Sequence, residues 1–369
     1  MKILIIGPLK PLRGGIAHSN EILIHNLKKN HEVINISFST LFPKFLYPGK
    51  FQNETNKKSG TLNSLNPINW KNHAKKINKL NPDLVIFQWW TSFLSPCYSF
   101  LASNIKSKKI AMCQNIFPHS EGKLKKIINP IHKFLSKQFL SKMNKLIAMS
   151  KSDLKKIKNI FPTKKTGLYL EPVYEIEGIT TKISKSNAKK QLKITEKNVL
   201  LFFGFVREYK GLKYLLKAMP EIIKVTNARL LIVGEFWQNK KEYLKLIKKE
   251  GIKKNITIVD EYVPNEKIPI YFNASDLLIL PYLDISESGI IRMAFNFNLP
   301  ILSTNVGGNP DHITNEFNGY LVQRKNSEEI AQKTIDFFKK NKFKEMSKAM
   351  KIKKQELKWS GKKENEIIN

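Results

Sequence analysis

The sequence has few cysteines and lacks a long apolar run. Only Cys97 and Cys113 occur among its 369 residues, which excludes a disulfide scaffold and a cysteine-rich metal site. Uninterrupted apolar stretches stay well below the ~18 residues that a membrane span needs. Residues 84–103 come closest, but polar residues and Pro96 interrupt them. The N-terminal segment MKILIIGPLKP is too short an apolar run for a signal peptide, so we expect a cytoplasmic protein.

Acidic residues are also scarce relative to basic ones. The chain has 64 lysines and arginines against 30 aspartates and glutamates, for a net charge of +34 and a pI near 9.9. Such a chain attracts phosphates, nucleic acids or anionic membranes. Drift toward lysine on solvated faces, as an AT-rich genome produces, explains much of the same charge. The sequence contains no nucleic-acid-binding motif, so we expect no nucleic-acid partner.

Arginine is rare, which makes each of its positions informative. Only five arginines occur, and the other basic residues are lysines. A planar guanidinium grips a phosphate through two parallel hydrogen bonds, and an ammonium cannot reproduce that geometry. Arg13, Arg207 and Arg292 each lie within a few residues of a glycine motif. These motifs are the first candidates for phosphate binding.

Apolar periodicity predicts alternating strands and helices in both halves of the chain. Expected strands span residues 2–8, 32–38, 83–89, 109–115, 145–150, 199–205, 229–235, 256–263, 276–281 and 300–305. Expected helices span residues 17–29, 70–79, 97–105, 123–141, 152–160, 212–225, 240–250, 288–297, 328–340 and 343–366. This alternation is typical of parallel sheets with helices on both faces. We predict an α/β protein with two Rossmann-like, doubly wound domains that face a cleft.

The polar stretch 171–198 breaks the alternation and is expected to link the two domains. We place the N-terminal domain at residues 1–175 and the C-terminal domain at 195–350. A C-terminal helix at 351–369 is expected to cross back to the first domain. Ligands of doubly wound sheets bind at the C-terminal ends of the strands, so the motifs that follow each strand matter most.

Gly14 and Gly15 follow the first predicted strand and precede a predicted helix. Glycine lets the backbone approach a ligand closely, and a helix N-terminus favours an anion. The loop is not a G-x-G-x-x-G motif, and the second strand ends in the residues FST at 38–40, with no acid to bind a cofactor ribose. A nicotinamide-dependent enzyme is therefore disfavoured. A plain turn explains the glycine pair equally well.

Three glycine corners follow strands of the second half. Within GFVREYKG at 204–211, Arg207 and Lys210 lie in a loop where two cations can converge on a diphosphate. Each charge-assisted contact contributes roughly 1.5–3 kcal/mol. Ser288 and Gly289 offer backbone N–H groups at a predicted helix N-terminus, and VGGNPD at 306–311 forms the third corner. Three corners on one sheet edge predict a shared anion site.

The order and spacing of these motifs resemble those of group 1 (family 4) glycosyltransferases, which have the GT-B fold. The segments that carry the resemblance are PLRGGIAHSN at 11–20, FFGFVREYKGLKYLLKAM at 202–219, LLIVGEFW at 230–237, PYLDISESGIIRMAF at 281–295, PILSTNVGGNPDHI at 300–313 and NGYLV at 318–322. The resemblance implies transfer of a sugar, with retention at the anomeric carbon, from a nucleotide-diphosphate-sugar donor. The implied acceptor is a glycan or a lipid-linked molecule, in bacterial surface polysaccharide synthesis.

The resemblance also implies roles for individual residues. Contacts with the donor diphosphate are expected from Arg207, Lys210, Ser288, Gly289, Gly14 and Gly15. Contacts with the nucleotide base are expected from Gly234, Glu235 and Phe236.

The sequence departs from the family where catalysis is expected. Members usually have two glutamates eight positions apart around this helix. Met293 occupies the second position here, and Glu287 is the only acid near the first. The Glu287 carboxylate either replaces that glutamate or is solvated. The usual histidine after the fourth strand is replaced by Gln114, so His119 and His18 are the candidates for contact with sugar or acceptor, with a structural role as the alternative for each.

The most basic stretch, residues 123–158, holds eleven lysines and one acid, with apolar residues at helical spacing. It predicts either a surface helix that docks on the anionic inner face of the cell membrane or an ordinary amphipathic helix.

No D-x-D motif occurs, so we expect neither a metal nor a cofactor. Cations of the chain would instead stabilise the departing diphosphate. Two other functions stay open at this point. One is a nucleotide-sugar epimerase on the same scaffold, and the other is a non-catalytic basic protein that binds polyanions or membranes.

Overall fold

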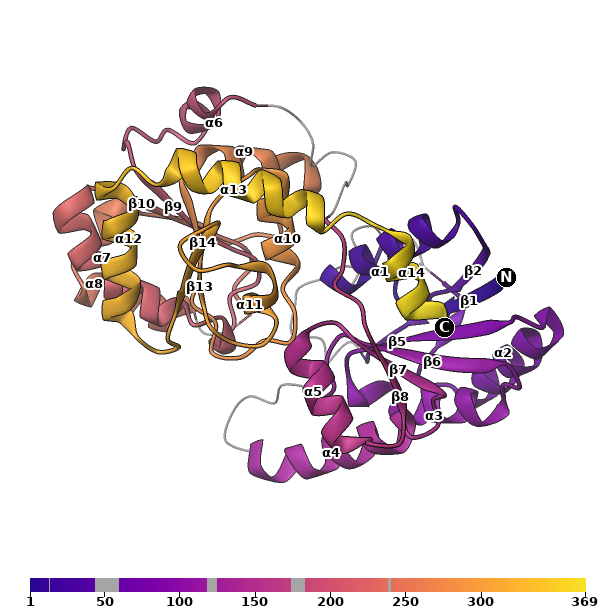
Figure 1. Ribbon diagram of the computed structural model, residues 1–369. Helices are drawn as coiled ribbons and strands as arrows, with labels where there is room; N and C mark the ends of the chain where they lie inside the picture. Colours follow the sequence, from indigo (N-terminus) through magenta and orange to yellow (C-terminus); the bar gives the residue numbers. More distant parts are fainter. Residues whose placement is uncertain (13, 44–59, 118–124, 174–182, 238–239) are drawn as a thin grey trace. The chain divides into compact units, whose positions relative to one another are not determined.

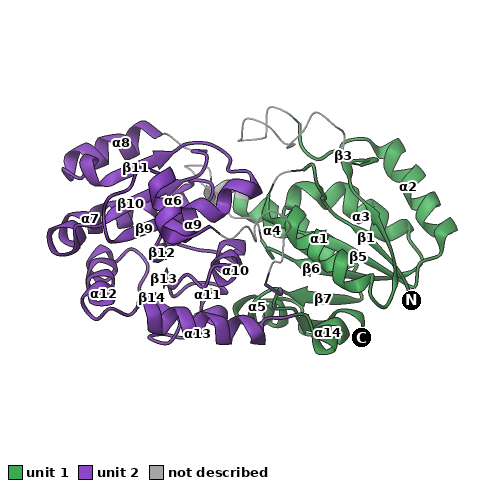
Figure 2. Ribbon diagram, turned by 90° about the horizontal axis from the view of Figure 1, so that it is seen from above, with its two compact units in different colours: residues 1–171, 359–369 green, residues 172–358 purple. Residues whose placement is uncertain are grey.

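A computed structural model describes residues 1–12, 14–43, 60–117, 125–173, 183–237 and 240–369 (Figure 1). The chain forms two compact units, coloured separately in Figure 2. The first unit comprises Met1–Glu171 together with Trp359–Asn369, and the second comprises Pro172–Lys358. The second unit thus extends beyond the predicted 195–350 at both ends.

The first unit contains a six-stranded parallel sheet in the order β2-β1-β5-β6-β7-β8. Its strands are β1 (Lys2–Ile6), β2 (Glu32–Ile36), β5 (Leu84–Trp89), β6 (Lys108–Cys113), β7 (Lys145–Ala148) and β8 (Lys165–Leu168). Ile3 of β1 lies opposite Val33 on one side and Leu84 on the other, which fixes the register at the centre of the sheet. The short strands β3 (Phe38–Thr40) and β4 (Leu62–Asn63) form a separate parallel pair.

Helices cover both faces of the first sheet, because successive strand residues point to opposite faces and both sets are apolar. Ile3 and Ile5 pack with residues of α1 (Gly15–Leu27) and α14 (Gly361–Ile368). Leu4 and Ile6 belong to the core on the other face. That core is covered by α2 (Pro67–Leu80), α3 (Ser95–Asn104), α4 (Lys125–Leu140) and α5 (Lys151–Ile160).

The second unit repeats this architecture with a parallel sheet in the order β11-β10-β9-β12-β13-β14. Its strands are β9 (Val199–Phe203), β10 (Arg229–Val233), β11 (Ile256–Val259), β12 (Leu277–Leu280), β13 (Ile301–Thr304) and β14 (Gly319–Val322). The chain runs from β9 to β11 toward one edge and then returns to place β12 beside β9. The strand order therefore reverses between β9 and β12, which is where doubly wound sheets bind ligands.

Helices again cover both faces of the second sheet. On one face lie α7 (Leu212–Thr226), α8 (Lys240–Lys249) and α12 (Ser327–Lys339). On the other lie α9 (Ile268–Ala274), α10 (Gly289–Asn296) and α13 (Phe343–Glu356), while α6 (Lys185–Gln191) packs on α9 and α11 (Asn309–His312) follows β13. None of the described helices is both long and apolar enough to span a membrane.

The doubly wound α/β class is confirmed, and each predicted strand is present, but several elements were missed. Strands β8 and β14 are only four residues long, and each contains a glycine. Helix α6 lies inside the predicted linker, and its Ser184 hydroxyl accepts a hydrogen bond from the Asn187 N–H as an N-cap. The single helix predicted at 343–366 is two helices, α13 in the second unit and α14 in the first.

Candidate active site at the edge of the second sheet

The candidate site is built from two loops at the carboxyl edge of the second sheet. Residues 204–211 connect β9 to α7, and residues 281–288 connect β12 to α10. Because β9 and β12 are neighbours at the reversal of strand order, the two loops lie side by side. The predicted residues Arg207, Lys210 and Ser288 therefore share one edge of one sheet.

The backbone joins these two loops directly. The Leu283 N–H donates to the Tyr209 carbonyl oxygen at 2.7 Å. Gly211 has φ +68°, and a Cβ there would lie 1.8 Å from the Pro281 carbonyl oxygen. Only glycine allows this approach, so the end of one loop is fixed against the start of the other.

A buried chain of polar side chains links the same loops. The Lys210 ammonium donates to the Tyr282 hydroxyl at 2.9 Å, and the Tyr282 hydroxyl lies 3.3 Å from the Ser288 hydroxyl. All three residues are buried. Tyr282 was not among the predicted residues, although it lies two positions after the end of β12. Lys210 and Ser288, both predicted to hold a diphosphate, thus meet through a residue that was not predicted.

The electrostatics around Lys210 suit an anionic ligand. Burial lowers the pKa of Lys210; the Tyr209 hydroxyl opposes this shift, and the Arg207 guanidinium adds to it. The Arg207 guanidinium therefore disfavours the positive charge on Lys210. A diphosphate between them would stabilise both cations.

Aromatic rings surround the Arg207 guanidinium, which lies 5.2 Å from the ring centre of Tyr209 and 5.7 Å from that of Trp237. Trp237 in turn packs on Phe205 with ring centres 4.2 Å apart, and Phe205 lies 6.3 Å from Tyr262. These rings follow β9, β10 and β11 in turn. This aromatic cluster was not predicted. Of its residues, Trp237 ends the segment LLIVGEFW that carries the family resemblance, but no role was expected for it.

Gly234, Glu235 and Phe236, which were predicted to contact the nucleotide base, make backbone contacts with neighbouring loops at this sheet edge. Gly234 has φ +141°, and a Cβ there would lie 2.2 Å from the Gly204 carbonyl oxygen. The buried Glu235 accepts a backbone hydrogen bond from Val206 at 2.9 Å. The Phe236 N–H donates to an Asp260 carboxylate oxygen at 2.9 Å. Their contact with a base stays a prediction.

Ser288 and Gly289 begin helix α10 as predicted. Ser288 is the N-cap residue, and its side chain makes no capping bond to the helix backbone, since its hydroxyl faces Tyr282. The first N–H groups of a helix have no partner within the helix and carry a partial positive charge. They are suited to meet the same anion as Lys210.

The side chain of Glu287 is only 4% exposed and is paired, so the alternative of a solvated carboxylate is wrong. One of its oxygens, Oε1, binds both the Arg292 guanidinium and the His312 Nε2, the latter at 2.8 Å. Burial pushes the pKa of Glu287 upward, but His312 and Arg292 outweigh burial and hold the pKa below its usual value. The other oxygen, Oε2, is buried without a hydrogen-bond partner in the described part of the chain. The catalytic role of Glu287 stays a prediction.

The third glycine corner supports the loop that carries Glu287. Gly307 has φ +55°, and a Cβ there would lie 1.5 Å from the Ile285 carbonyl oxygen. The Gly308 N–H donates to the Ser286 carbonyl oxygen at 3.1 Å. The corner therefore helps to position residues 285–288, in addition to the contact between Glu287 and His312.

The predicted residues of the first unit lie near the start of α1. Gly14 is the N-cap with φ +123°, and a Cβ at Gly14 or Gly15 would meet no described atom within 4 Å. His18, on the first turn, has its Nδ1 3.8 Å from a Glu21 carboxylate oxygen. Approach to the donor by these three residues stays a prediction. His119 falls outside the described residues.

Gln114, which replaces the usual histidine, is part of a buried polar network. Its Nε2 donates to the Ser19 hydroxyl at 3.1 Å and to the Gln88 side-chain oxygen at 3.3 Å. Gln88 also reaches Asn20 at 3.3 Å. The network ties the ends of β5 and β6 to α1 and gives Gln114 a structural role.

Comparison with known proteins places the second unit in a family. The family model "Glycosyl transferases group 1" matches residues 184–357. An uncharacterized glycosyltransferase of Methanocaldococcus jannaschii is 28% identical over 138 residues, covering 37% of this chain and 34% of that protein. Spore coat protein SA of Bacillus subtilis is 26% identical over 163 residues, covering 42% of each. These matches span about a third to two-fifths of the length of the curated relatives.

Solved structures share the fold over nearly the whole chain. Sucrose-phosphate synthase from Thermosynechococcus elongatus aligns with a TM-score of 0.76 and 12% identity, covering 99% of this chain and 97% of that one. Anabaena HepE in complex with UDP-glucose aligns with a TM-score of 0.72 and 16% identity, covering 97% and 96%. Residues 184–357 therefore belong to the group 1 glycosyltransferase family, and the chain has the GT-B fold.

Proposed function

We propose that the chain is a glycosyltransferase that binds a nucleotide-diphosphate-sugar donor at the carboxyl edge of the second sheet. The observation that carries this proposal is the group formed by Arg207, Lys210 and the start of α10 at the reversal of strand order. Two cations and a helix N-terminus there would hold a diphosphate. The family match over the same unit supports this choice of ligand.

The proposed mechanism is stabilisation of the leaving group. When the bond between the sugar and the diphosphate breaks, negative charge develops on the diphosphate oxygens. Arg207, Lys210 and the N–H groups of α10 would already be in place to receive it. Burial strengthens the interactions of Lys210 and of the start of α10, because the local dielectric constant is lower than in water. We propose that the reaction needs no metal and, from the resemblance to the family, retains the anomeric configuration.

We propose that the aromatic cluster beside Arg207 stacks on the base of the donor. Trp237, Phe205 and Tyr262 are each half-buried, so part of each ring stays accessible. Planar bases stack on such rings. Since HepE, which shares the fold, has been solved with UDP-glucose, UDP-sugars are the first donors to test.

We propose a glycan or a lipid-linked molecule as the acceptor, in the synthesis of a surface polysaccharide. The support comes from relatives named spore coat protein SA and CapJ, a Staphylococcus aureus protein that is 28% identical over 166 residues and covers 43% of this chain.

Incubation of the full chain with a panel of nucleotide-sugars tests the activity. A transferase releases the nucleoside diphosphate and transfers or hydrolyses the sugar. An epimerase would return an isomer of the sugar that is still joined to the nucleotide. A chain that neither binds nor consumes any donor, yet binds polyanions in a strongly salt-dependent way, would favour the non-catalytic alternative.

A second proposal, that α4 docks on an anionic membrane, rests on its exposed side chains. Ile131 and Phe134 are 55% and 67% exposed at neighbouring helical positions, and Lys133 and Lys137 are exposed beside them. Apolar side chains flanked by lysines are typical of helices that lie in the membrane interface. The side chains of residues 125–128, which include Lys125 and Lys126, are outside those described.

Sedimentation with anionic vesicles tests this docking. The change Phe134→Ser with Lys133→Glu should leave the protein in the supernatant, while Lys75→Glu with Lys76→Glu on α2 should not. Equal sedimentation of both variants would contradict docking through α4.

A further inference from the structure

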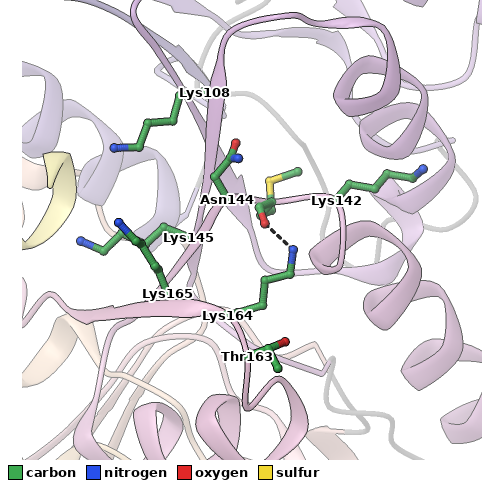
Figure 3. Close-up of a pocket in the computed structure, with 8 residues that line it drawn as sticks. Lys108, Lys142, Asn144, Lys145, Thr163, Lys164 and Lys165 are labelled. Atoms are coloured by element: carbon green, nitrogen blue, oxygen red, sulfur yellow. Dashed lines mark hydrogen bonds between the residues drawn. The ribbon is translucent and has the colours of Figure 1, made fainter.

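A separate site lies at the amino-terminal edge of the first sheet, where β6, β7 and β8 begin. It is a cavity of about 460 Å³, shown in Figure 3. The side chains that line it include five lysines, Lys108, Lys142, Lys145, Lys164 and Lys165. They come together because three parallel strands each start with a lysine at the same sheet edge. This site takes no part in the function proposed above.

The charge of this lysine pocket is not neutralised within the described part of the chain. None of the five ammonium groups lies within 4.0 Å of a described carboxylate. The acid that acts on Lys145 is Glu366, whose Oε2 accepts a hydrogen bond from the Leu168 N–H at 3.4 Å. Five lysines therefore line the cavity, and no acidic side chain is among its lining residues.

Backbone carbonyl groups hold three of the lysines in place. Lys164 donates to the carbonyl oxygens of Ser141 and Met143 at 2.6 and 2.7 Å; the bond to Met143 is drawn in Figure 3. Lys145 donates to the Glu366 carbonyl at 2.6 Å, and Lys108 donates to the Ile368 carbonyl at 3.2 Å, both at the end of α14. The positions of these three ammonium groups are therefore fixed without a ligand.

The lysines also repel one another. Burial lowers the pKa of the Lys145 ammonium; Glu366 raises it, and Lys108 and Lys165 lower it again. A bound anion would remove this repulsion. Neutral donors complete the lining: Asn144, whose side-chain oxygen already accepts from the Lys109 N–H at 2.8 Å, and the hydroxyl of Thr163.

We infer that the lysine pocket binds a phosphate group, either free or as the headgroup of a phospholipid. Ammonium groups, an amide N–H₂ and a hydroxyl are all donors to phosphate oxygens. The volume falls in the range of small-molecule sites, so a phosphate that carries a small organic group fits. The site belongs to the first unit, whereas the proposed donor site belongs to the second.

Protection of lysines from acylation tests this site on the full chain. The protein is treated with an amine-acylating reagent in inorganic phosphate or in chloride of equal ionic strength, and labelling is read residue by residue by mass spectrometry. At phosphate about tenfold above its dissociation constant, labelling of Lys142 and Lys165 should fall by about tenfold. Lys155 and Lys158, exposed on α5, should label equally in both salts.

The variant Lys142→Gln/Lys165→Gln is a second arm, because neither side chain makes a described hydrogen bond. It should abolish the protection of Lys108 by phosphate, while Arg207→Ala, in the proposed donor site, should keep it. Failure of the donor proposal therefore leaves this result unaffected.

Vesicles distinguish the two sources of phosphate. Protection by phosphatidylglycerol vesicles but not by inorganic phosphate or phosphatidylcholine would assign a lipid headgroup, and protection by inorganic phosphate would assign a free phosphate. If neither inorganic phosphate nor any vesicle protects the pocket lysines, even where vesicles protect Lys133 of α4, the inference is overturned.

Discussion

At the scale of single residues, the buried Lys210 ammonium must be stabilised while no ligand is bound. Lys210 is buried, and its described hydrogen bond is to Tyr282, which in turn reaches Ser288. An ammonium has three donors, so one hydroxyl leaves capacity for an incoming anion. Tyr282 thus keeps Lys210 in position until the donor arrives.

Tyr282→Phe should remove that acceptor while it keeps the ring. We expect a loss of about 1–3 kcal/mol in the free energy of unfolding, because the Lys210 ammonium would be left buried without this hydrogen bond. Urea unfolding measures it, with Tyr271→Phe on α9 as the control. An equal, small effect of both changes would mean that the Tyr282 hydroxyl does not support Lys210.

Glu287→Gln should destabilise the protein because it removes the charge that pairs with the buried Arg292 guanidinium and weakens the hydrogen bond to His312. Removal of one partner from a buried ion pair costs about 3–5 kcal/mol. The control Glu345→Gln breaks an exposed pair with Lys342 and should cost below about 1 kcal/mol.

The effect of Glu287→Gln should depend on pH. The pKa of Glu287 is lowered in the folded protein, so its stabilising charge is fully present above the unfolded pKa of about 4.3 and is lost as pH falls through the lower, folded value. Urea unfolding across this range should show the difference between wild type and variant shrinking as the pH falls. A difference that stays constant from neutral to acid pH would show that the charge of Glu287 is not what stabilises the fold.

The sequence could locate these residues but not their partners. Glu287 was found by its place in a motif, yet its pairing with His312 joins positions 25 residues apart, which meet because the loop after β13 bonds to the loop before α10. Gln114 was likewise recognised as a replacement, whereas its bonds to Ser19 and Gln88 come from three separate elements.

At the scale of elements, glycine corners fix the loops of the candidate site. Gly307 and Gly251 both have positive φ, at +55° and +69°, but only Gly307 has a neighbour where a Cβ would be. Gly251→Ala should therefore cost about 1–2 kcal/mol for the left-handed backbone alone. Gly307→Ala should cost more and should also weaken donor binding, because it displaces residues 285–288.

Urea unfolding and donor titration of the Gly251→Ala and Gly307→Ala variants distinguish backbone strain from displacement of residues 285–288. Equal costs in stability and unchanged donor affinity would show that the corner does not position the loop.

Two elements that periodicity failed to predict, β8 and α6, have little apolar surface, whereas α9 was missed although Ile268, Tyr271 and Phe272 are buried. Strand β8 reads KTGL and takes its place from pairing with β7, and its Gly167 allows α14 to approach. Helix α6 reads KSNAKKQ, with only Ala188 buried. Tertiary packing decides such segments, whereas the strands of the two cores were predictable from unbroken apolar runs.

At the scale of the whole molecule, the two ends of the chain lie in one unit. Helix α14 buries Ile367 in the core of the first unit, and its Glu364 bonds His31 at 3.0 Å. Removal of residues 359–369 should therefore destabilise the first unit and spare the second. Amide hydrogen exchange should rise by about tenfold or more in β1, β7 and β8 and stay unchanged in β9–β14. Unchanged exchange in the first unit would show that α14 does not stabilise it.

The central claim is that Arg207 and Lys210 hold the diphosphate of a nucleotide-sugar. Titration calorimetry with the donor that the panel identifies should give an affinity about 100-fold or more weaker for Arg207→Ala/Lys210→Ala, since each contact is worth about 1.5–3 kcal/mol. Lys217→Ala/Lys224→Ala, which removes two exposed lysines from α7 of the same unit, should bind like the wild type. Wild-type affinity in an Arg207→Ala/Lys210→Ala protein with an unchanged circular dichroism spectrum would contradict the account.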